Sequence, residues 1–147
     1  MADDGSLIIR PAIASDAGAL AELAGELGYE VKPEEAEVRL AALPVVDDLL
    51  VATSGDHVVG WIHLSVSHTL VVHTHVQILG LVVREGWRDK GVGRRLMKHA
   101  EAWARQHGAS TILLRSNTQR EGARRFYEAL GYHTLKTQRV LVRELDR

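Results

Sequence analysis

The sequence of 147 residues contains no cysteine. Without it the chain has no disulfide, no thiol nucleophile and no thiolate ligand for a metal ion. The sequence also lacks an excess of charge of one sign, because 18 basic residues stand against 19 acidic ones. A protein that holds nucleic acid by general electrostatic attraction carries a clear positive excess. We therefore expect no nucleic-acid partner.

Long hydrophobic runs are missing as well. No apolar stretch approaches the ~18 residues that a membrane-spanning helix needs. The first ten residues, MADDGSLIIR, lack the basic and then apolar pattern of a secretory signal. The balance of 46% hydrophobic and 25% charged residues is typical of a globular domain with its own core. We expect one domain over residues 1–147, ordered over about 7–145, in the cytoplasm and without a membrane partner.

The order of apolar segments predicts an α/β fold with a mixed sheet covered by helices. Helices are expected where apolar residues recur at i, i+3, i+4 and i+7, and strands where short apolar runs occur. Segment 67–75, SHTLVVHTH, fits either an extension of two strands or a loop over a site. The predicted strands are 7–13, two strands within 48–66 joined at Ser54-Gly55-Asp56, 76–83, 110–116, and one or two within 132–145. The predicted helices are 15–29, 33–44, 93–108 and 120–132.

A glycine-rich turn precedes the third predicted helix. Gly91 and Gly93 stand at its entrance, where about four backbone N–H groups lack intrahelical partners and the helix dipole is positive. Glycine removes the Cβ atoms that would keep an anion away from those amides. Between Arg84 and Lys98, six basic residues stand against two acidic ones. The pattern predicts an anion site, and its alternative is a surface turn before a solvated helix. Leu96 in place of a third glycine excludes the G-x-G-x-x-G fingerprint.

The wider stretch LGLVVREGWRDKGVGRRL resembles the acyl-CoA-binding signature of the Gcn5-related N-acetyltransferase (GNAT) superfamily. Arg88, Gly91 and Gly93 fit its pattern [Q/R]-x-x-G-x-[G/A], and RRFYEALGY at 124–132 resembles its second hallmark. The resemblance covers nearly the whole chain. It implies the GNAT acyl-CoA N-acyltransferase fold, with a mixed central sheet of six or seven strands flanked by four helices. It also implies an N-acetyltransferase with acetyl-CoA as co-substrate.

The resemblance implies where acetyl-CoA would bind. In the family, the strand matching Ile78–Val83 splays from the strand matching Thr111–Arg115, and pantetheine enters the gap. The turn's amides wrap the pyrophosphate, basic side chains add charge, and an asparagine binds pantetheine amides. The implied residues are Leu81, Val82, Val83, Arg88, Asp89, Lys90, Gly91, Val92, Gly93, Arg94 and Asn117. Any buried strand would also be apolar at 81–83, and Asn117 is equally an ordinary loop residue.

The resemblance also implies a catalytic acid. The family tyrosine that matches Tyr127 protonates the leaving thiolate. A phenol, with an ordinary pKa of ~10, is protonated at neutral pH, whereas a thiolate (~8.5) is a modest base that needs a nearby donor. The alternative is that Tyr127 is only a core residue beside Phe126.

The family pattern breaks at the catalytic base. Many relatives carry a glutamate four positions before the Leu of L-V-V, where this chain has Gln77, which cannot accept a proton. Imidazoles ordinarily titrate near pH 6.5, and His73 and His75 would share a strand face with Gln77. We expect His75 to act as base, directly or through a water held by Gln77, with Tyr29, His63, His73 and Gln77 in the acceptor site. Histidines that simply face solvent are the alternative. No metal site is expected, since no carboxylate or cysteine completes the His73-Thr74-His75 pair.

The acceptor is less defined by the sequence. Likeness to aminoalkylphosphonate N-acetyltransferases through VVGWIHL, LVV and RRFYEALGY implies the amine of a small molecule, although fold does not fix substrate. Protein N-termini or lysines are alternative acceptors. A non-catalytic acyl-CoA-binding or regulatory module, favoured by Gln77, and an unrelated nucleotide-binding module are alternative functions. A homodimer is compatible with pairing of the final strands across subunits.

Overall fold

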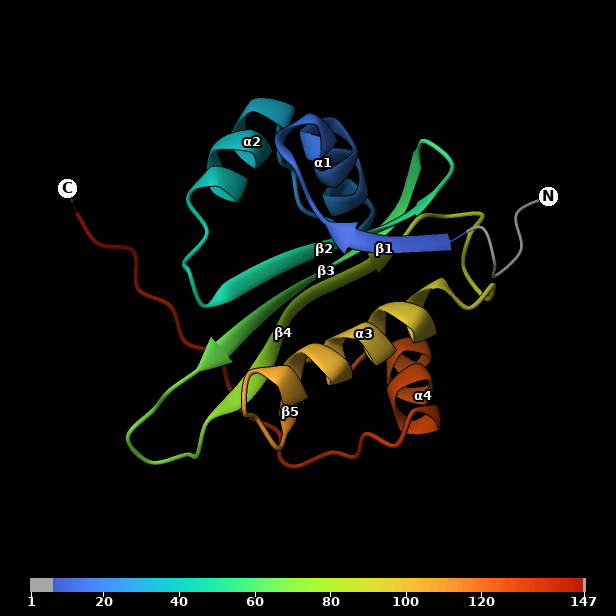
Figure 1. The fold of residues 1–147 in the computed structure, drawn as a ribbon. Coiled ribbons are helices and arrows are strands. Elements are labelled where there is room, and N and C mark those ends of the chain that lie inside the picture. The colour runs from blue at the N-terminus through green and yellow to red at the C-terminus, as the bar shows by residue number, and fades with distance from the viewer. Residues whose placement is uncertain (1–6, 147) are drawn as a thin grey trace. The chain divides into compact units, whose positions relative to one another are not determined.

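A computed structural model describes residues 7–146 of the chain (Figure 1). These residues form two compact units, the first up to Arg115 and the second from Ser116. The first unit contains the sheet and three α-helices, and the second contains one α-helix. That the whole chain forms one domain, as its composition predicts, stays a prediction.

The sheet of the first unit has five strands, and their order in space is their order in the chain. The first four are antiparallel to their neighbours, and the fifth is parallel to the fourth. The second and third strands form the predicted hairpin at Gly55-Asp56. The strands are β1 (Leu7–Pro11), β2 (Asp47–Ser54), β3 (His57–Ser67), β4 (His75–Val83) and β5 (Ile112–Leu114).

Helices cover both faces of this sheet (Figure 1). On one face, α1 (Ala17–Glu26) and α2 (Pro33–Ala41) pack a core cluster that includes Leu23 and reaches Val82 of β4. Pro33 stands at the first turn of α2, as predicted, because its fixed φ suits that position. On the other face lies α3 (Val92–Gln106), which buries Leu96, Met97 and Ala100 among others.

Asp16 lies in the short connection between β1 and α1. It closes a 3₁₀ turn (Ala14–Asp16), and its side chain forms no capping hydrogen bond to α1. The carboxylate instead accepts the Ile13 N–H at 2.8 Å and two hydrogen bonds from Arg10, at 2.8 and 3.0 Å. This ion pair, in which Asp16 is buried and Arg10 is partly exposed, fixes the corner between strand and helix.

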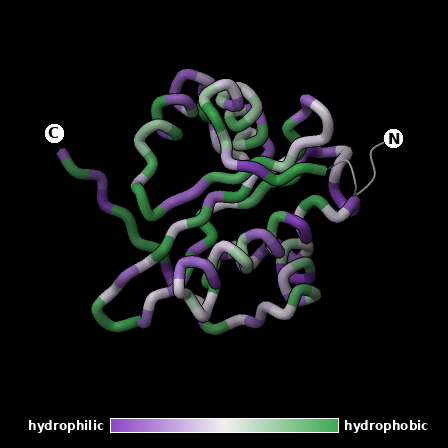
Figure 2. Tube along the Cα trace, viewed as in Figure 1, coloured by the Kyte–Doolittle hydropathy of each residue, from purple (hydrophilic) through white to green (hydrophobic). Residues whose placement is uncertain are grey.

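The second unit corrects the predicted strand count. It contains α4 (Glu121–Ala129), which ends before Gly131 at φ +96°. Residues 132–146 form neither helix nor strand in the described chain, so the prediction of strands within 132–145 and of six or seven strands in total is wrong. Hydrophobic and polar stretches alternate along this segment (Figure 2). Its apolar side chains stay 70–88% exposed: Leu135, Val140, Leu141, Val142 and Leu145. This alternation favours a β-strand, but a strand forms only where a neighbouring strand completes the hydrogen-bond ladder.

Candidate functional site

The two ends of β4 are paired differently. From Val76 to Ile78 the strand is hydrogen-bonded to β3 on one side and to β5 on the other. From Leu79 to Val83, β3 is its only partner strand within residues 7–146, because β5 ends at Leu114. This half of β4, which includes Leu81, Val82 and Val83, therefore presents an open backbone edge. Such an edge can pair with the amide groups of an extended ligand.

A β-bulge marks the point where β4 changes partners. His63 pairs with Gly80 and Leu64 with Ile78, so Leu79 is an extra residue in β4. Bulges increase the local twist and are frequent beside active sites. At Gly80, a Cβ atom would lie only 2.8 Å from the ring of Trp61. The position therefore needs glycine for the indole to lie over the strand.

The turn after β4 leads into the start of α3. Asp89 (φ +62°) and Gly91 (φ +84°) both adopt the left-handed conformation, and Gly91 is the N-cap without a side-chain capping bond. The first intrahelical bond runs from Arg95 N–H to the Gly91 carbonyl at 3.0 Å. The amides of residues 92–94 thus precede the first intrahelical donor, Arg95 N–H, and lie at the positive end of the dipole. This geometry suits an anion.

Glu26, at the end of α1, holds this turn in place. Its Oε1 accepts the Glu85 backbone N–H at 2.8 Å and an Arg88 guanidinium N–H at 3.0 Å. Arg88 Nε–H also donates to the Val83 carbonyl at 3.1 Å, so its side chain braces the turn. The Lys90 ammonium lies 5.5 Å from the centroid of the Trp87 ring. Sequence analysis missed Glu26, since its partners lie 59 and 62 residues away and no local motif links them.

A second missed residue, Asp47, lies in a polar group on the face that α1 and α2 partly cover. Trp61 packs against the core cluster on that face, and alternate residues of β3 share it. Asp47 Oδ2 accepts a bond from His63 Nε2–H at 2.9 Å, and its Oδ1 accepts the Ser65 hydroxyl at 2.6 Å. The Asp47 side chain is 5% exposed and that of His63 23%. The sequence offered no signal beyond a carboxylate at a strand start.

Gln77 lies in the same row of the sheet, since Ser65 pairs with Asp47 on one side and with Gln77 on the other. Its Oε1 accepts a bond from Arg115 Nη1–H at 3.0 Å, and its Nε2 lies 3.5 Å from His75 Nε2. His75 Nδ1–H donates to the backbone carbonyl of His73 at 3.0 Å. His75 is only 5% exposed, and both of its ring nitrogens have a partner.

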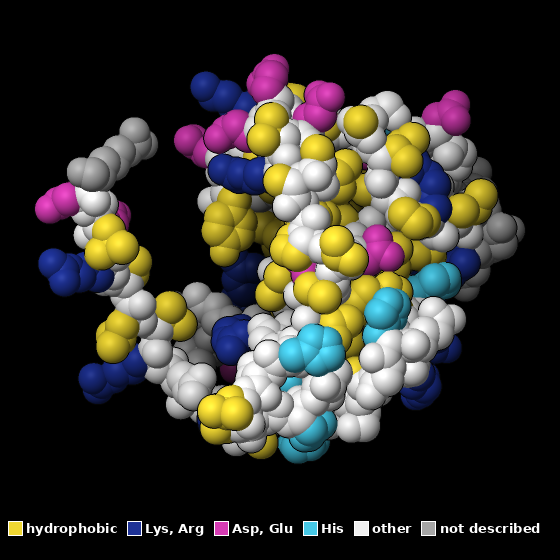
Figure 3. All heavy atoms as spheres, turned by 60° about the vertical axis from the view of Figure 1, so that its left-hand side comes forward, with side chains coloured by type: hydrophobic (Ala, Val, Ile, Leu, Met, Phe, Trp, Pro, Cys, Tyr) yellow, Lys and Arg dark blue, Asp and Glu magenta, His cyan; other side chains and the backbone are white. Residues whose placement is uncertain are grey.

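The other predicted acceptor residues lie outside this row. β4 begins at His75, so His73 belongs to the loop 68–74, where its Nε2 lies 3.1 Å from Thr111 Oγ1. Figure 3 shows histidine side chains gathered on one face of the molecule, beside hydrophobic ones. Tyr29 follows α1 and lines a hollow of about 570 Å³ with Glu22 and Glu35 among others. Neither Asp47, His63 nor Gln77 is among the residues that line this hollow.

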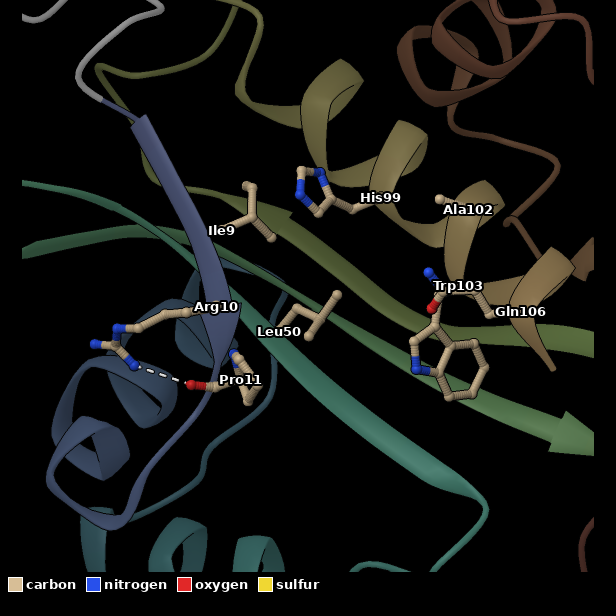
Figure 4. A pocket seen from close by; sticks show the side chains of 8 residues that line it. All are labelled: Ile9, Arg10, Pro11, Leu50, His99, Ala102, Trp103 and Gln106. Carbon is tan, nitrogen blue, oxygen red and sulfur yellow. Dashed lines mark hydrogen bonds between the residues drawn. The ribbon is translucent and has the colours of Figure 1, made fainter.

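A smaller groove of about 220 Å³ lies between β1 and α3 (Figure 4). Ile9, Leu50 and Trp103 give it mainly apolar walls, and His99 stands at its edge. In Figure 4 the Arg10 guanidinium turns away from Trp103 and donates to the Pro11 carbonyl at 3.0 Å. Because β1 is the far strand of the sheet from β5, this groove is remote from the open edge of β4.

Tyr127 and Asn117 belong to the second unit. Tyr127 of α4 contacts the rings of Phe126 and Tyr132, with centroids 5.1 and 6.0 Å away. Burial raises the pKa of the Tyr127 phenol above its ordinary value. Asn117 Oδ1 accepts the Gln119 N–H at 2.9 Å, which leaves its NH₂ group for other partners.

Residues 7–146 contain neither a metal-ligand cluster nor a membrane-spanning helix. No group of three or more histidine and carboxylate side chains is arranged to hold a metal ion there. None of the helices in this range has the length and apolar character needed to cross a membrane.

Comparisons with known proteins identify the family and the fold. The family model for the acetyltransferase (GNAT) family matches residues 19–132. A Bacillus subtilis (strain 168) protein, uncharacterized N-acetyltransferase YhdJ, is 42% identical over 59 residues. That match spans 40% of this chain and 42% of the relative, so less than half of the relative's length is covered.

Solved structures share the fold over nearly the whole chain. A transcriptional regulator from Bacillus halodurans C-125 superposes with a TM-score of 0.82 at 23% identity, covering 92% of this chain and 99% of that one. The aminoglycoside antibiotic 6'-N-acetyltransferase AAC(6')-Ih from Acinetobacter baumannii gives a TM-score of 0.81 at 17% identity, covering 95% and 99%. At such identities the likeness concerns the fold alone.

Proposed function

Because the chain belongs to the acetyltransferase (GNAT) family, we propose that it moves the acetyl group of acetyl-CoA to a primary amine of a small molecule by direct attack. Members of this family generally use acetyl-CoA as co-substrate. The observation that carries the proposal is the open edge of β4 from Leu79 to Val83, which the turn of residues 84–91 connects to the amides at the start of α3.

In the proposed site, the open edge of β4 and the turn before α3 bind different parts of acetyl-CoA. The amides of pantetheine pair with the backbone of residues 81–83, as an added strand would. The pyrophosphate lies against the amides of residues 92–94, with Asp89 and the glycines at 91 and 93 shaping the turn. Lys90 and Arg94 add positive charge near the phosphates. Arg88 acts by bracing the turn, and the Asn117 amide group donates to pantetheine.

Tyr127 is the proposed acid for the leaving thiolate. Its raised pKa supports this role, because a phenol that resists ionisation keeps its proton at neutral pH. The proposal expects Tyr127→Phe to lower kcat by about 100-fold, since the thiolate then leaves without a proton donor.

The acceptor amine is proposed to lie over the face that carries His63 and Gln77, between the loops of Tyr29 and His73. A small amine suits this face, since its one buried carboxylate already has two partners and a polycationic acceptor would want several. For His75 to act as base, a proton must reach Nε2 past the Gln77 amide or through a water beside it.

A free-CoA assay over a panel of amines tests the proposal. We expect release with one class of small primary amine and little with protein N-termini or lysine peptides. Release of CoA with peptides alone would contradict the small-molecule acceptor and favour protein N-termini or lysines instead.

A non-catalytic acyl-CoA-binding module is the second candidate, because Gln77 stands where relatives have a base. Calorimetry that shows acetyl-CoA binding, together with no CoA release from any amine, would support it. The Tyr127→Phe variant would then bind and behave as the parent chain does.

A homodimer and a cytoplasmic location stay proposals. The dimer is supported by the exposed apolar side chains within 135–145, which β-augmentation by a second copy would cover. Light scattering after gel filtration tests it, and a monomer at all concentrations would contradict it.

A further inference from the structure

We propose that His63 and Asp47 form a dyad that takes the proton from the acceptor ammonium, in the role that glutamate fills in many relatives. The inference deepens the proposed function and rests on it. It assigns the base to β2 and β3, whereas sequence analysis predicted His75 of β4.

The hydrogen bond between the two side chains fixes the tautomer of the imidazole. An ionised carboxylate only accepts, so the bond of 2.9 Å requires that His63 Nε2 carries the proton. In the neutral ring the other nitrogen, Nδ1, then has a lone pair. Residues 7–146 give this Nδ1 no hydrogen-bond partner, and the side chain is 23% exposed, so a small ligand can reach it.

Asp47 is held for this task. Its side chain is 5% exposed, and the Ser65 hydroxyl fixes Oδ1 at 2.6 Å while Oδ2 faces the imidazole. A carboxylate in this position orients the ring and stabilises the imidazolium that forms when Nδ1 accepts a proton. A strand-face histidine that merely faced solvent would need no such buried partner.

The dyad also lies next to the open edge of β4. His63 pairs with Gly80, the residue beside the bulge at Leu79 where pairing with β5 has ended. Gly80 has no side chain to separate His63 from that point. By contrast, His75 pairs with Ser67 at the other end of β4, and both of its nitrogens are engaged.

The charged and titratable groups in the hydrogen bonds of this face lie on, or next to, three strands. They are Asp47 at the start of β2, His75 at the start of β4, and Arg115 after β5, which binds Gln77. Asp47 is the group that contacts His63 directly.

The ammonium R–NH₃⁺ gives one proton to His63 Nδ1, and the nitrogen lone pair forms a bond to the thioester carbonyl carbon. The C–S bond breaks, and the leaving sulfur ends as the CoA thiol with a second proton that the nitrogen has lost, relayed by the proposed acid. The products are the amide and CoA, and the imidazolium releases its proton to water.

Two small amines of similar size separate this role from a structural one. Ethylamine is an ammonium ion at neutral pH, whereas methoxyamine is already neutral and needs no base before attack. We expect His63→Gln to lower kcat/KM for ethylamine by about 100-fold and for methoxyamine by less than about tenfold. The rate with ethylamine should recover as the pH rises and the amine loses its own proton.

Matched variants keep the experiment decisive. His57→Gln changes an exposed histidine at the start of the same strand and should leave both rates unchanged. Asp47→Asn serves as a second variant and should show the same selective loss. Melting temperature and acetyl-CoA affinity report whether each variant is folded.

Equal losses with both amines, or a selective loss in His75→Gln and not in His63→Gln, would overturn the dyad. If the parent chain acetylates neither these amines nor any other in the panel, the proposed function is contradicted instead.

Discussion

Asp16 and Asp47 are buried to nearly the same extent, with side chains 7% and 5% exposed, yet they have different kinds of partner. Asp16 is paired with a guanidinium and a backbone N–H, neither of which changes charge near neutral pH. Asp47 is paired with an imidazole and a hydroxyl, and an imidazole can gain or lose a proton. The comparison teaches that the partner, and not the burial, separates a carboxylate that holds the fold from one suited to chemistry.

The largest expected effect is on activity, where the two carboxylates should differ. Asp47→Asn should lower kcat/KM with an ammonium substrate by about 100-fold, because the imidazolium loses its counter-charge. Asp16→Asn should leave kcat/KM unchanged. Steady-state assays of folded protein measure both, with Asp48→Asn as a control on the same strand, since its carboxylate accepts the N–H of the next residue. Equal values of kcat/KM for Asp47→Asn and Asp16→Asn would contradict this distinction between the two carboxylates.

The next largest effect concerns stability, and here the variant of Asp16 is the affected one. Asp16→Asn should lower the free energy of unfolding by about 2 kcal/mol, because Arg10 then loses its buried counter-ion. Hydrogen bonds from Arg10 lower the pKa of the Asp16 carboxyl. The pair therefore contributes its full stability above the ordinary carboxyl pKa, and this is lost as the pH falls through the lowered value.

Urea unfolding at several pH values checks this expectation. The gap between the parent chain and Asp16→Asn should be constant near neutrality and close under strongly acidic conditions. A gap that persists at the lowest pH would show that the variant acts through packing instead.

The same contrast extends to the two ends of α3. Gly91 (φ +84°) and Gly108 (φ +78°) share the left-handed conformation, so alanine at either position should cost about 1 kcal/mol of stability. Only Gly91→Ala should also weaken acetyl-CoA binding, by about tenfold, since only that end presents amides to an anion. Calorimetry on both variants measures this. Equal affinities would place the diphosphate elsewhere.

The smallest expected effect concerns the brace on the turn. Glu26→Gln should raise the KM for acetyl-CoA by about threefold, because a partly exposed ion pair with Arg88 contributes less than 1 kcal/mol. The kcat at saturating acetyl-CoA should be unchanged. Glu22→Gln, which alters the ion pair of a more exposed glutamate with Arg84, serves as control. A fall in kcat would mean that Glu26 does more than hold the turn.

Much of the fold could be predicted because its signals are local. Pro33 begins α2, Gly55-Asp56 forms the hairpin turn, and Gly91 caps α3, each from the conformational limits of one or two residues. The strand predicted within 132–145 failed because its formation depends on a partner strand that neighbouring residues cannot reveal.

The candidate site was predicted only where it follows a motif. Arg88, Gly91 and Gly93 are close together in the sequence, so the family resemblance could predict them as part of the site, and their role stays a prediction. Asp47 and Glu26 could not be found in this way, because their partners lie 16 residues away in one case and about 60 in the other. Contacts of this range appear only once the sheet register and the packing of α1 are known.

The indole over Gly80 has a consequence for any redesign of the proposed acceptor site. Since even a methyl group at this position would collide with Trp61, the strand side of that proposed site should tolerate little change. If the proposal holds, new specificity would have to be engineered in the loops around Tyr29 and His73.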